Sequence, residues 1–316
     1  MMNAAIRTGG GIAFGTRAAP KAPCSGEVTV RVRCASINPV DYKLPAFIAG
    51  PVAGIDVSGV VESVADDVKH LFSPGDEVFG FSNGSVCELT TADASKLARK
   101  PPSLTHREAA ALPTAHLTSF QALFVHGALP KRDARGASVL VLGASGGCGL
   151  SALALTRAAG ADEIVAVCSA ANAELARSRG ATACVDYRDA AKMRAFAESS
   201  AGRFDVVYDA ATGSGAGEAY GALAAEVVKP ETGRRVALNG GLGFWFRTLT
   251  GWQRTRDVGM LTRQNGAELE EILAFPGDAA RPVVDSTYPL TREGVRDAFE
   301  RLKSRRARGK IVIDVA

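Results

Sequence analysis

The stretch Ser138–Thr156, SVLVLGASGGCGLSALALT, decides the fold that we expect for this chain. It begins as a short apolar strand, passes through four glycines within seven residues, from Gly143 to Gly149, and continues as a helix. The N-terminus of such a helix presents unpaired N–H groups and a partial positive charge, which suit a phosphate. We therefore predict a cradle for the pyrophosphate of a dinucleotide. A glycine turn without a ligand is the alternative, and a Walker loop is excluded because no Gly-Lys-Ser or Gly-Lys-Thr follows.

The residues after Arg135 alternate between expected strands and expected helices. The strands are short, apolar and β-branched, and we place them at Ser138–Leu142, Glu163–Cys168, Ala183–Asp186, Phe204–Asp209 and Arg235–Asn239. Helical stretches separate them, at Cys148–Ala159, Ala171–Arg179, Ala190–Ser199 and Gly215–Val228. Apolar strands that alternate with helices predict a doubly wound parallel sheet of the Rossmann type, covered on both faces.

The first hundred residues have a different, β-rich character. Glu27–Ala35 alternates between polar and apolar residues, as a half-buried strand does, and Asp56–Val64 and Asp76–Phe81 are further short strands. Glycine-containing turns separate these strands, so we expect a small barrel or sandwich. Beyond this region we expect helices at Arg107–Leu112, Thr114–Leu129, Leu269–Phe275 and Arg292–Lys303, a break at Pro113, and a final strand at Lys310–Val315.

The composition excludes several classes of protein. The chain has 316 residues, of which 47% are apolar and 22% charged, so it is globular and large enough for two domains. A net charge of +4 without a basic stripe argues against nucleic acid as a partner. Ala137–Thr156 is uncharged and long enough to span a membrane, but its central glycines would interrupt the helix, so we predict no membrane span.

The cysteines and the N-terminus bear on the compartment. Six scattered cysteines without a C-x-x-C pair predict free thiols in a reducing compartment, and we expect a cytoplasmic protein. Residues 1–26 contain basic residues and no acid, as mitochondrial presequences do. Strand-like residues already begin at Met2, so import into mitochondria is the less favoured alternative.

The end of the second expected Rossmann strand favours NADP(H) over NAD(H). NAD sites usually place an acid there to bind the ribose hydroxyl, whereas residues 167–172 read VCSAAN, without an acid. Ser169 and Asn172 could donate hydrogen bonds to a 2′-phosphate. No Arg or Lys stands beside Ser169, but Tyr187 and Arg188 could supply a phenol and a positive charge.

Several motifs occur in a fixed order along nearly the whole chain. They are Asn38–Lys43 (NPVDYK), Gly54–Val60 (GIDVSGV), Gly75–Gly80 (GDEVFG) and Ser145–Gly149 (SGGCG). Together they resemble the zinc-free quinone oxidoreductases of the medium-chain dehydrogenase/reductase superfamily, the zeta-crystallin-like branch. The resemblance implies a GroES-like β-rich catalytic domain, residues 1–112 and 270–316, and a Rossmann NADP(H)-binding domain, residues 113–269. It also implies a homodimer.

The resemblance supplies candidate site residues. Contacts to the cofactor are expected from Thr118, Ser145, Gly146, Gly147, Cys148, Ser169, Asn172, Tyr187, Asn239, Gly240, Arg308, Gly309 and Lys310. Candidate catalytic residues are Asn38, Asp41, Tyr42 and Lys43. Asn38 and Asp41 are expected to shape the turn and to contact the substrate or the nicotinamide amide, with a purely local hydrogen-bonding role as the alternative for Asp41. Tyr42 and Lys43 are candidate proton donors, with a pocket wall and a solvated lysine as the equally favoured alternatives.

The resemblance also bears on zinc. Zinc-dependent alcohol dehydrogenases have a cysteine where Asn38 stands and a His-Glu pair where Ile55 and Asp56 stand, and Asp56 alone cannot hold zinc. Without a metal to polarise an alcohol, we expect NADPH to reduce an activated acceptor, a quinone or an α,β-unsaturated carbonyl (enal or enone).

Two other functions stay open. One is an NADPH-binding protein of the same fold with a mainly binding or structural role, and the other is an alcohol dehydrogenase with atypical zinc. The acceptor depends on a pocket that we expect between Leu44–Val52, Phe81–Val86 and Leu242–Thr250. The aromatic stretch Leu242–Thr250 could equally form a dimer contact or pack in a core.

Overall fold

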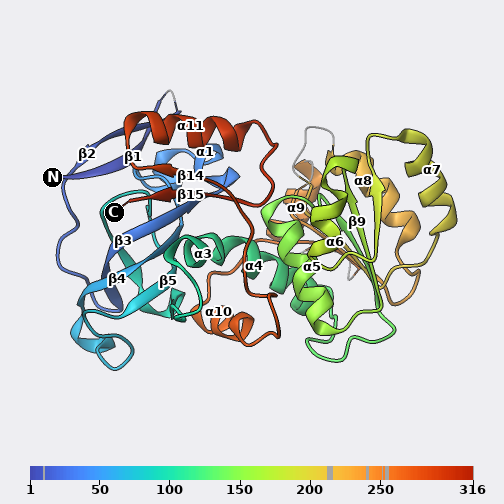
Figure 1. Ribbon diagram of the computed structural model, residues 1–316, viewed down its shortest axis with the longest axis horizontal. Coiled ribbons are helices and arrows are strands. Elements are labelled where there is room, and N and C mark those ends of the chain that lie inside the picture. The colour runs from blue at the N-terminus through green and yellow to red at the C-terminus, as the bar shows by residue number, and fades with distance from the viewer. Residues whose placement is uncertain (10, 212–215, 240–241, 251, 253–255, 316) are drawn as a thin grey trace. The chain divides into compact units, whose positions relative to one another are not determined.

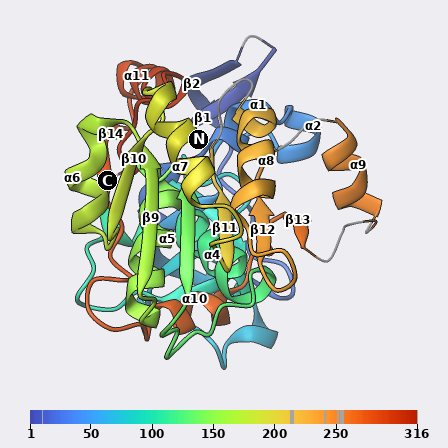
Figure 2. The ribbon, with the colours of Figure 1, turned by 90° about the vertical axis from the view of Figure 1, so that its right-hand side faces the viewer.

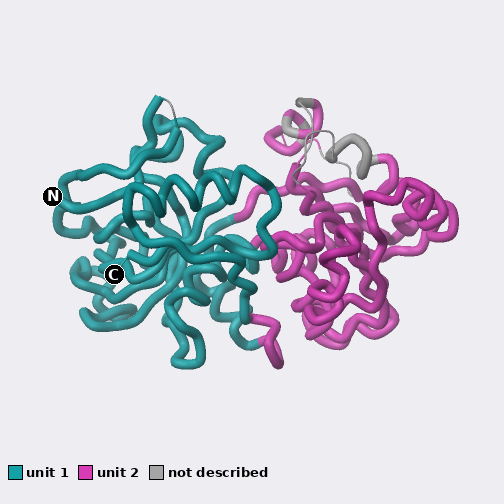
Figure 3. The backbone as a smooth tube through the Cα atoms, turned by 45° about the horizontal axis from the view of Figure 1, so that its top comes forward, with its two compact units in different colours: residues 1–117, 263–274, 281–316 teal, residues 118–262, 275–280 magenta. Residues whose placement is uncertain are grey.

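The computed structural model divides the chain into two compact units (Figure 3). Unit 1 comprises Met1–Leu117, Arg263–Ala274 and Arg281–Ala316, and unit 2 comprises Thr118–Thr262 and Phe275–Ala280. The structure describes residues 1–9, 11–211, 216–239, 242–250, 252 and 256–315. The first division falls within helix α4 (Pro113–Phe120), whose start is bonded to unit 1: the backbone N–H of Thr114 donates to Asp56 Oδ1 over 3.0 Å.

Unit 1 is built on a sheet with the strand order β14-β15-β3-β4-β5-β7, with β6 also paired to β3. The last strand of the chain, β15, lies antiparallel to β3, and Ile311 pairs with Ile37 (Figure 1). This pairing brings the C-terminal residues next to the Asn38 turn. The elements of unit 1 are β1 (Met2–Thr8), β2 (Gly11–Arg17), β3 (Glu27–Ile37), α1 (Pro39–Lys43), α2 (Ala46–Ala49), β4 (Asp56–Val64), β5 (Glu77–Phe81), β6 (Leu89–Asp93), β7 (Leu97–Arg99), α3 (His106–Ala111), α10 (Gly266–Leu273), β14 (Val284–Pro289), α11 (Arg292–Lys303) and β15 (Lys310–Asp314).

The core of unit 1 explains why these strands form. Val28, Val30 and Val32 of β3 are buried together, while Arg31 between them is exposed, as the alternation in the sequence predicts. Helix α11 contributes its apolar stripe, including Phe299, to the same core. The β-rich interpretation of the first hundred residues is therefore confirmed.

Unit 2 contains a parallel sheet with the order β10-β9-β8-β11-β12-β13. Helices α7 and α8 pack on one face of it, and α5 and α6 lie on the other (Figures 1 and 2). This arrangement is the predicted doubly wound α/β fold. The elements are β8 (Ser138–Leu142), α5 (Gly147–Ala159), β9 (Glu163–Cys168), α6 (Ala173–Ser178), β10 (Ala183–Asp186), α7 (Ala190–Ser199), β11 (Val206–Asp209), α8 (Ala216–Val227), β12 (Arg234–Ala237), α9 (Leu242–Thr250) and β13 (Asp257–Gly259).

Some expected elements differ from those observed. Two helices are separated here as expected, but the break falls at Leu112, and Pro113 begins α4 because a helix tolerates proline in its first turn. One helix was expected over Thr114–Leu129. In the structure the α-helix ends at Phe120, and a π-helical turn follows over Gln121–His126. Strands β2, β6, β7 and β14 were not expected, since each is short and only partly apolar. The start of the helix expected at Gly215 lies outside the described residues.

The uncharged run Ala137–Thr156 is divided between β8 and α5. Within the described part of the chain, no helix is long and apolar enough to cross a membrane.

Candidate functional site

The glycine turn between β8 and α5 is shaped by close backbone contacts. Gly143 has a φ of +74°, in the left-handed region, and a Cβ added to it would lie 2.9 Å from the backbone nitrogen of Ala211. A Cβ on Gly149 would lie 2.4 Å from the carbonyl oxygen of Gly143. Both positions therefore require glycine for the turn itself, whatever the turn binds.

The start of α5 leaves space for an anion. Gly146 is the N-cap of this helix, and a Cβ added to it would meet only the carbonyl oxygen of Gly143, at 3.6 Å. Ser145, Gly147 and Cys148 are half-buried beside it, and the first N–H groups of a helix have no partner within the helix itself. An open face lined by backbone N–H groups suits a pyrophosphate. The residues present therefore fit a dinucleotide cofactor.

The residues expected near the ribose meet at one end of the sheet. Asp186 at the end of β10 pairs with Cys168 at the end of β9, and the Tyr187 N–H donates to the Cys168 carbonyl over 3.3 Å. Ser169 is buried directly after β9. Tyr187 is about half exposed, and the Arg188 guanidinium lies 5.8 Å from the centre of its ring. The structure thus gathers a hydroxyl, a phenol and a positive charge at this end.

The remaining cofactor candidates of unit 2 lie in different settings. Asn239 donates from Nδ2 to the carbonyl of Ala211 over 3.0 Å, close to the glycine turn. Thr118 is buried, and its hydroxyl lies 2.7 Å from that of Thr262. Asn172 is partly buried at the start of α6. Gly240 lies outside the described residues.

In unit 1 the end of β3 leads into a tightly bonded turn. Asn38 is the N-cap of α1, and its backbone N–H donates to Asp41 Oδ2 over 2.7 Å. Asp41 Oδ1 accepts the N–H of Gly54 over 3.0 Å. Asp41 is fully buried, and this burial raises its pKa to about 6 although the Asn38 N–H and Arg7 favour the charged form. The Asp41 carboxylate therefore holds the turn.

The Asn38 side chain belongs to a buried polar cluster. Its Nδ2 donates to Asp56 Oδ2 over 2.9 Å, and its Oδ1 accepts a hydrogen bond from the ammonium of Lys310. Lys310 also donates to Asp56 Oδ2 over 3.1 Å and to the carbonyl of Ile37 over 3.3 Å. The structure therefore gives the Lys310 ammonium three protein acceptors. The contact of Lys310 with the cofactor stays a prediction.

Asp56 is saturated with donors from elsewhere in unit 1. Besides Asn38 and Lys310, it accepts the hydroxyl of Ser36 over 2.9 Å, and both the N–H and the hydroxyl of Thr114. All of these groups except Thr114 are buried. The sequence marked Asp56 only as an insufficient zinc ligand. Its network could not be foreseen, because Ser36, Thr114 and Lys310 come together only through the folding of the sheet.

The other unit 1 candidates have separate roles. Tyr42 is partly buried against the core, and the Lys303 ammonium lies 5.8 Å from the centre of its ring. Lys43 is exposed. Arg308 is exposed, and its backbone N–H donates to Asp285 Oδ1 over 2.7 Å. Gly309 has a φ of +112°, and an added Cβ would lie 2.3 Å from the Val283 carbonyl oxygen, so it is required by the backbone.

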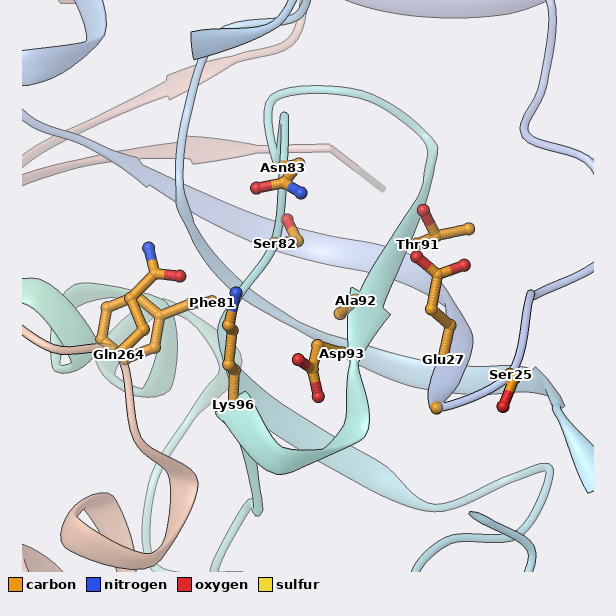
Figure 4. A pocket seen from close by; sticks show the side chains of 11 residues that line it. Ser25, Glu27, Phe81, Ser82, Asn83, Thr91, Ala92, Asp93, Lys96 and Gln264 are labelled. Atoms are coloured by element: carbon orange, nitrogen blue, oxygen red, sulfur yellow. The ribbon is translucent and has the colours of Figure 1, made fainter. Parts of the chain in front are cut away.

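A cavity of about 270 Å³ opens in unit 1 (Figure 4). Phe81, Ser82 and Asn83, from one of the stretches expected to line the acceptor pocket, form part of its wall. Glu27, Asp93 and Lys96 make the rest of the wall strongly polar. Its volume lies at the lower limit of about 300 Å³ for common ligand sites, so it suits a small polar molecule and not a dinucleotide.

A parallel sheet with a glycine cradle in unit 2, together with the β-rich sheet of unit 1, defines a two-unit dehydrogenase or reductase. Two family models match: "Alcohol dehydrogenase GroES-like domain" over residues 24–119 and "Zinc-binding dehydrogenase" over residues 179–313. The chain is 34% identical to 2-methylene-furan-3-one reductase of Solanum lycopersicum over 309 residues, which cover 91% of this chain and 71% of that protein.

One further relative agrees with this class, and one solved structure shares the fold. The mitochondrial NAD(P)H oxidoreductase RTN4IP1 of Bos taurus is 31% identical over 92% of this chain and 82% of its own. The quinone oxidoreductase structure from Coxiella burnetii shares the fold, with a TM-score of 0.79 at 24% identity over 100% of this chain and 99% of that one. The chain belongs to the medium-chain dehydrogenase/reductase superfamily of oxidoreductases, and the predicted superfamily is confirmed.

Proposed function

We propose that this protein is an NADPH-dependent reductase that delivers hydride to a quinone or to the β-carbon of an enal or enone, without zinc. The observation that carries this proposal is the buried cluster of Asn38, Asp56 and Lys310. It fills the positions at which zinc-dependent relatives are expected to hold their metal.

The residues of this cluster do not fit zinc. The description of one matching family model implies a zinc ion, which requires about three N, S or O ligands at converging positions. Here an amide stands in place of a thiolate, and the Asp56 carboxylate already binds an ammonium and further donors. A zinc ion would have to displace the Lys310 ammonium and break these hydrogen bonds. We therefore derive no step through zinc.

The support for NADPH comes from unit 2. The cradle at Gly146 is open towards a phosphate, and no acid follows β9 at the ribose end. Ser169 and Tyr187 lie together there, and Arg188 adds a positive charge. The Bos taurus relative is named as an NAD(P)H enzyme, which agrees with a nicotinamide cofactor. When bound, NADPH supplies the hydride.

The residues of unit 1 would position the acceptor and supply a proton. Without a metal, the acceptor has to be electrophilic already, as quinones and enones are, and the protein contributes orientation. Asn38 and Asp41 keep the turn in one conformation through their hydrogen bonds. Tyr42, which is partly buried, and Lys43, which is exposed to solvent, are the two candidate proton donors.

Turnover tests the proposal. The purified protein is expected to oxidise NADPH faster than the uncatalysed background with at least one acceptor from a panel of quinones, enals and enones. Tight binding of NADPH without turnover on any acceptor would favour the alternative, a protein of the same fold with a binding or structural role. Elemental analysis is expected to find less than stoichiometric zinc, and a full equivalent would contradict the zinc-free mechanism.

The cofactor preference has its own test. Ser169→Asp places a carboxylate where a 2′-phosphate would lie, and like charges repel. We expect kcat/KM for NADPH to fall by about tenfold or more while that for NADH is kept or rises. Ser178→Asp, on the exposed end of α6, is the matched control. An unchanged preference in Ser169→Asp would remove the assignment of the phosphate to this end of the sheet.

We further propose a homodimer formed through unit 2. Strand β13 ends the sheet as the described residues define it, and α9 beside it exposes Phe246 and Leu249. Sheet edges and exposed apolar side chains are typical of association surfaces. Sedimentation equilibrium is expected to give twice the monomer mass and to show dissociation in Leu249→Asp. A monomeric wild type would overturn this proposal.

The cytoplasmic location stays a prediction. The mitochondrial relative from Bos taurus agrees with the less favoured alternative of import. A fluorescent fusion at the C-terminus, imaged with a mitochondrial marker, would distinguish the two locations.

A further inference from the structure

Two carboxylates of unit 1 lie opposite each other where strands β3 and β6 pair. Glu27 at the start of β3 is the direct partner of Asp93 at the end of β6, and both side chains line the cavity of Figure 4. Direct partners in antiparallel strands have their side chains on the same face, and like charges at such positions repel. Within the described residues neither carboxylate forms a salt bridge. The pair therefore suits a positively charged group of a ligand.

The other side of the cavity carries a positive charge. Lys96 ends the short helical turn η2 (Ala94–Lys96) and is half-buried. No salt bridge or hydrogen bond joins its ammonium to any residue that the structure describes. Figure 4 shows this ammonium on the side of Ser82 and Gln264, opposite the carboxylate of Glu27. A half-buried ammonium beside a hydroxyl and an amide suits a carboxylate, which accepts several charge-assisted hydrogen bonds.

A buried hydroxyl in the wall of the cavity is unsatisfied. Ser82, directly after β5, is 4% exposed, and its Oγ makes no hydrogen bond within the described part of the chain. Buried polar groups in proteins nearly always have a partner, so an unsatisfied one in a cavity wall marks a place where a ligand completes the hydrogen bonds. This observation is independent of the charges of Glu27, Asp93 and Lys96, and it places a polar group of the ligand on the Lys96 side.

The volume of the cavity, about 270 Å³, limits the size of the ligand. A water takes up about 30 Å³ in the liquid, so this space suits a molecule of about nine non-hydrogen atoms. We propose that the cavity binds a small zwitterion, a free α-amino acid with a short or polar side chain. Its ammonium lies at Glu27 and Asp93. Its carboxylate lies at Lys96 and Ser82. The inference goes beyond the proposed function, because quinones, enals and enones carry neither charge.

Calorimetric titration of the purified protein with three matched probes tests the proposal. L-Serine carries both charges, whereas ethanolamine lacks the carboxylate and 3-hydroxypropionate lacks the ammonium. L-Serine is expected to bind with a Kd of about 1 mM or below, and each of the other two about tenfold or more weakly, because each loses one set of charge-assisted hydrogen bonds. The titration needs neither NADPH nor an acceptor, so its result does not depend on the proposed function.

Two variants assign the charges. Lys96→Met should weaken the binding of L-serine by about tenfold or more and leave that of ethanolamine unchanged, so the preference between these two probes disappears. The double variant Glu27→Gln/Asp93→Asn should remove the preference for L-serine over 3-hydroxypropionate. Its amides keep oxygens for the backbone N–H groups, such as that of Cys24, which both carboxylates now accept, so the fold is expected to survive. Lys69→Met, at an exposed lysine elsewhere in unit 1, is the control and should keep both preferences.

Three results would overturn the proposal. The first is no binding of L-serine, glycine, L-threonine or L-asparagine at concentrations up to about 10 mM. The second is wild-type protein that binds ethanolamine or 3-hydroxypropionate as tightly as L-serine, since the site would then recognise a single charge. The third is binding of L-serine that persists in both Lys96→Met and the double variant, which would place the bound molecule elsewhere on the protein.

Discussion

Replacing Lys310 by methionine would test the buried cluster directly. Lys310→Met keeps the length of the side chain but removes the ammonium, so the Asp56 carboxylate loses its only ionic partner among the described residues. The Lys310 and Asp56 side chains are 6% and 0% exposed, so solvent cannot replace the lost charge. Asn38 Oδ1 and the Ile37 carbonyl lose a donor as well.

The size of the effect follows from these contacts. Removing one partner of a buried ion pair costs about 3 to 5 kcal/mol, because the other charge stays buried and unpaired. Asp56 keeps the hydrogen bonds from Ser36, Asn38 and Thr114, so we expect the lower end, about 3 kcal/mol. The double variant Lys310→Met/Asp56→Asn removes the stranded charge and is expected to recover about half of this loss.

Hydrogen–deuterium exchange measured on peptides is the suitable assay. It reports the free energy of local opening in unit 1 by itself, whereas a global denaturation curve combines the unfolding of both units. Exchange should rise by about a hundredfold in peptides from β3, β4 and β15, as about 3 kcal/mol requires, and stay unchanged in β8 and β9.

A matched control is Lys69→Met. Lys69 pairs with Asp66 on the surface, with exposed fractions of 64% and 94%, so its loss should change the exchange very little. Two results would refute the reasoning. One is unchanged exchange in Lys310→Met. The other is a double variant that is destabilised as strongly as the sum of its single variants, since the two charges would then be independent.

Three further predictions follow from the same contacts. Gly149→Ala places a methyl group 2.4 Å from the Gly143 carbonyl oxygen, so NADPH affinity should fall by about tenfold or more in a fluorescence titration, with an unchanged circular dichroism spectrum as the control. Burial raises the pKa of Asp41 to about 6 in the folded protein, above the value of about 4 that the same carboxyl has in the unfolded chain. Its contribution to the free energy of unfolding is therefore fully present below about pH 4, and roughly 3 kcal/mol of it is lost as the pH rises from about 4 to 6. Urea denaturation of the wild type and of Asp41→Asn across this pH range is the measurement, and the variant should not show this loss. If the free energies of unfolding of the two proteins changed with pH in parallel, the prediction would be contradicted. Arg7→Met removes the hydrogen bonds to the Asp41 carbonyl of α1 and to the C-terminal end of α2, so protease cleavage between residues 44 and 52 should quicken while NADPH affinity is kept; equal cleavage rates would show that Arg7 does not hold the segment.

Local patterns allowed much of the fold to be predicted. The strand, glycine turn and helix at Ser138–Thr156 follow one another directly in the sequence, so their pattern can be recognised locally, and the structure has them as β8, the turn and α5. The alternation in Glu27–Ala35 likewise predicted a strand, although the structure buries more of it than the expected half. Short strands such as β7 were missed, because a run of three residues has too little period to be recognised.

The candidate site was predictable only in part. The residues after β9 and β10 could be grouped, since parallel strands end at the same edge of a sheet. Arg7 gave no signal, because its partner Asp41 is 34 residues away and either residue alone is typical of a solvated surface.

The sequence by itself determined the family, the two kinds of sheet and the place of the glycine cradle, because each depends on residues that are close along the chain. Only the tertiary structure decided what Asn38, Asp56 and Lys310 do. Lys310 lies 272 residues from Asn38, and they meet because β15 pairs with β3 and β3 with β4. Burial then turns an amide, a carboxylate and an ammonium into one hydrogen-bonded unit, since none of the three is stable there without the others.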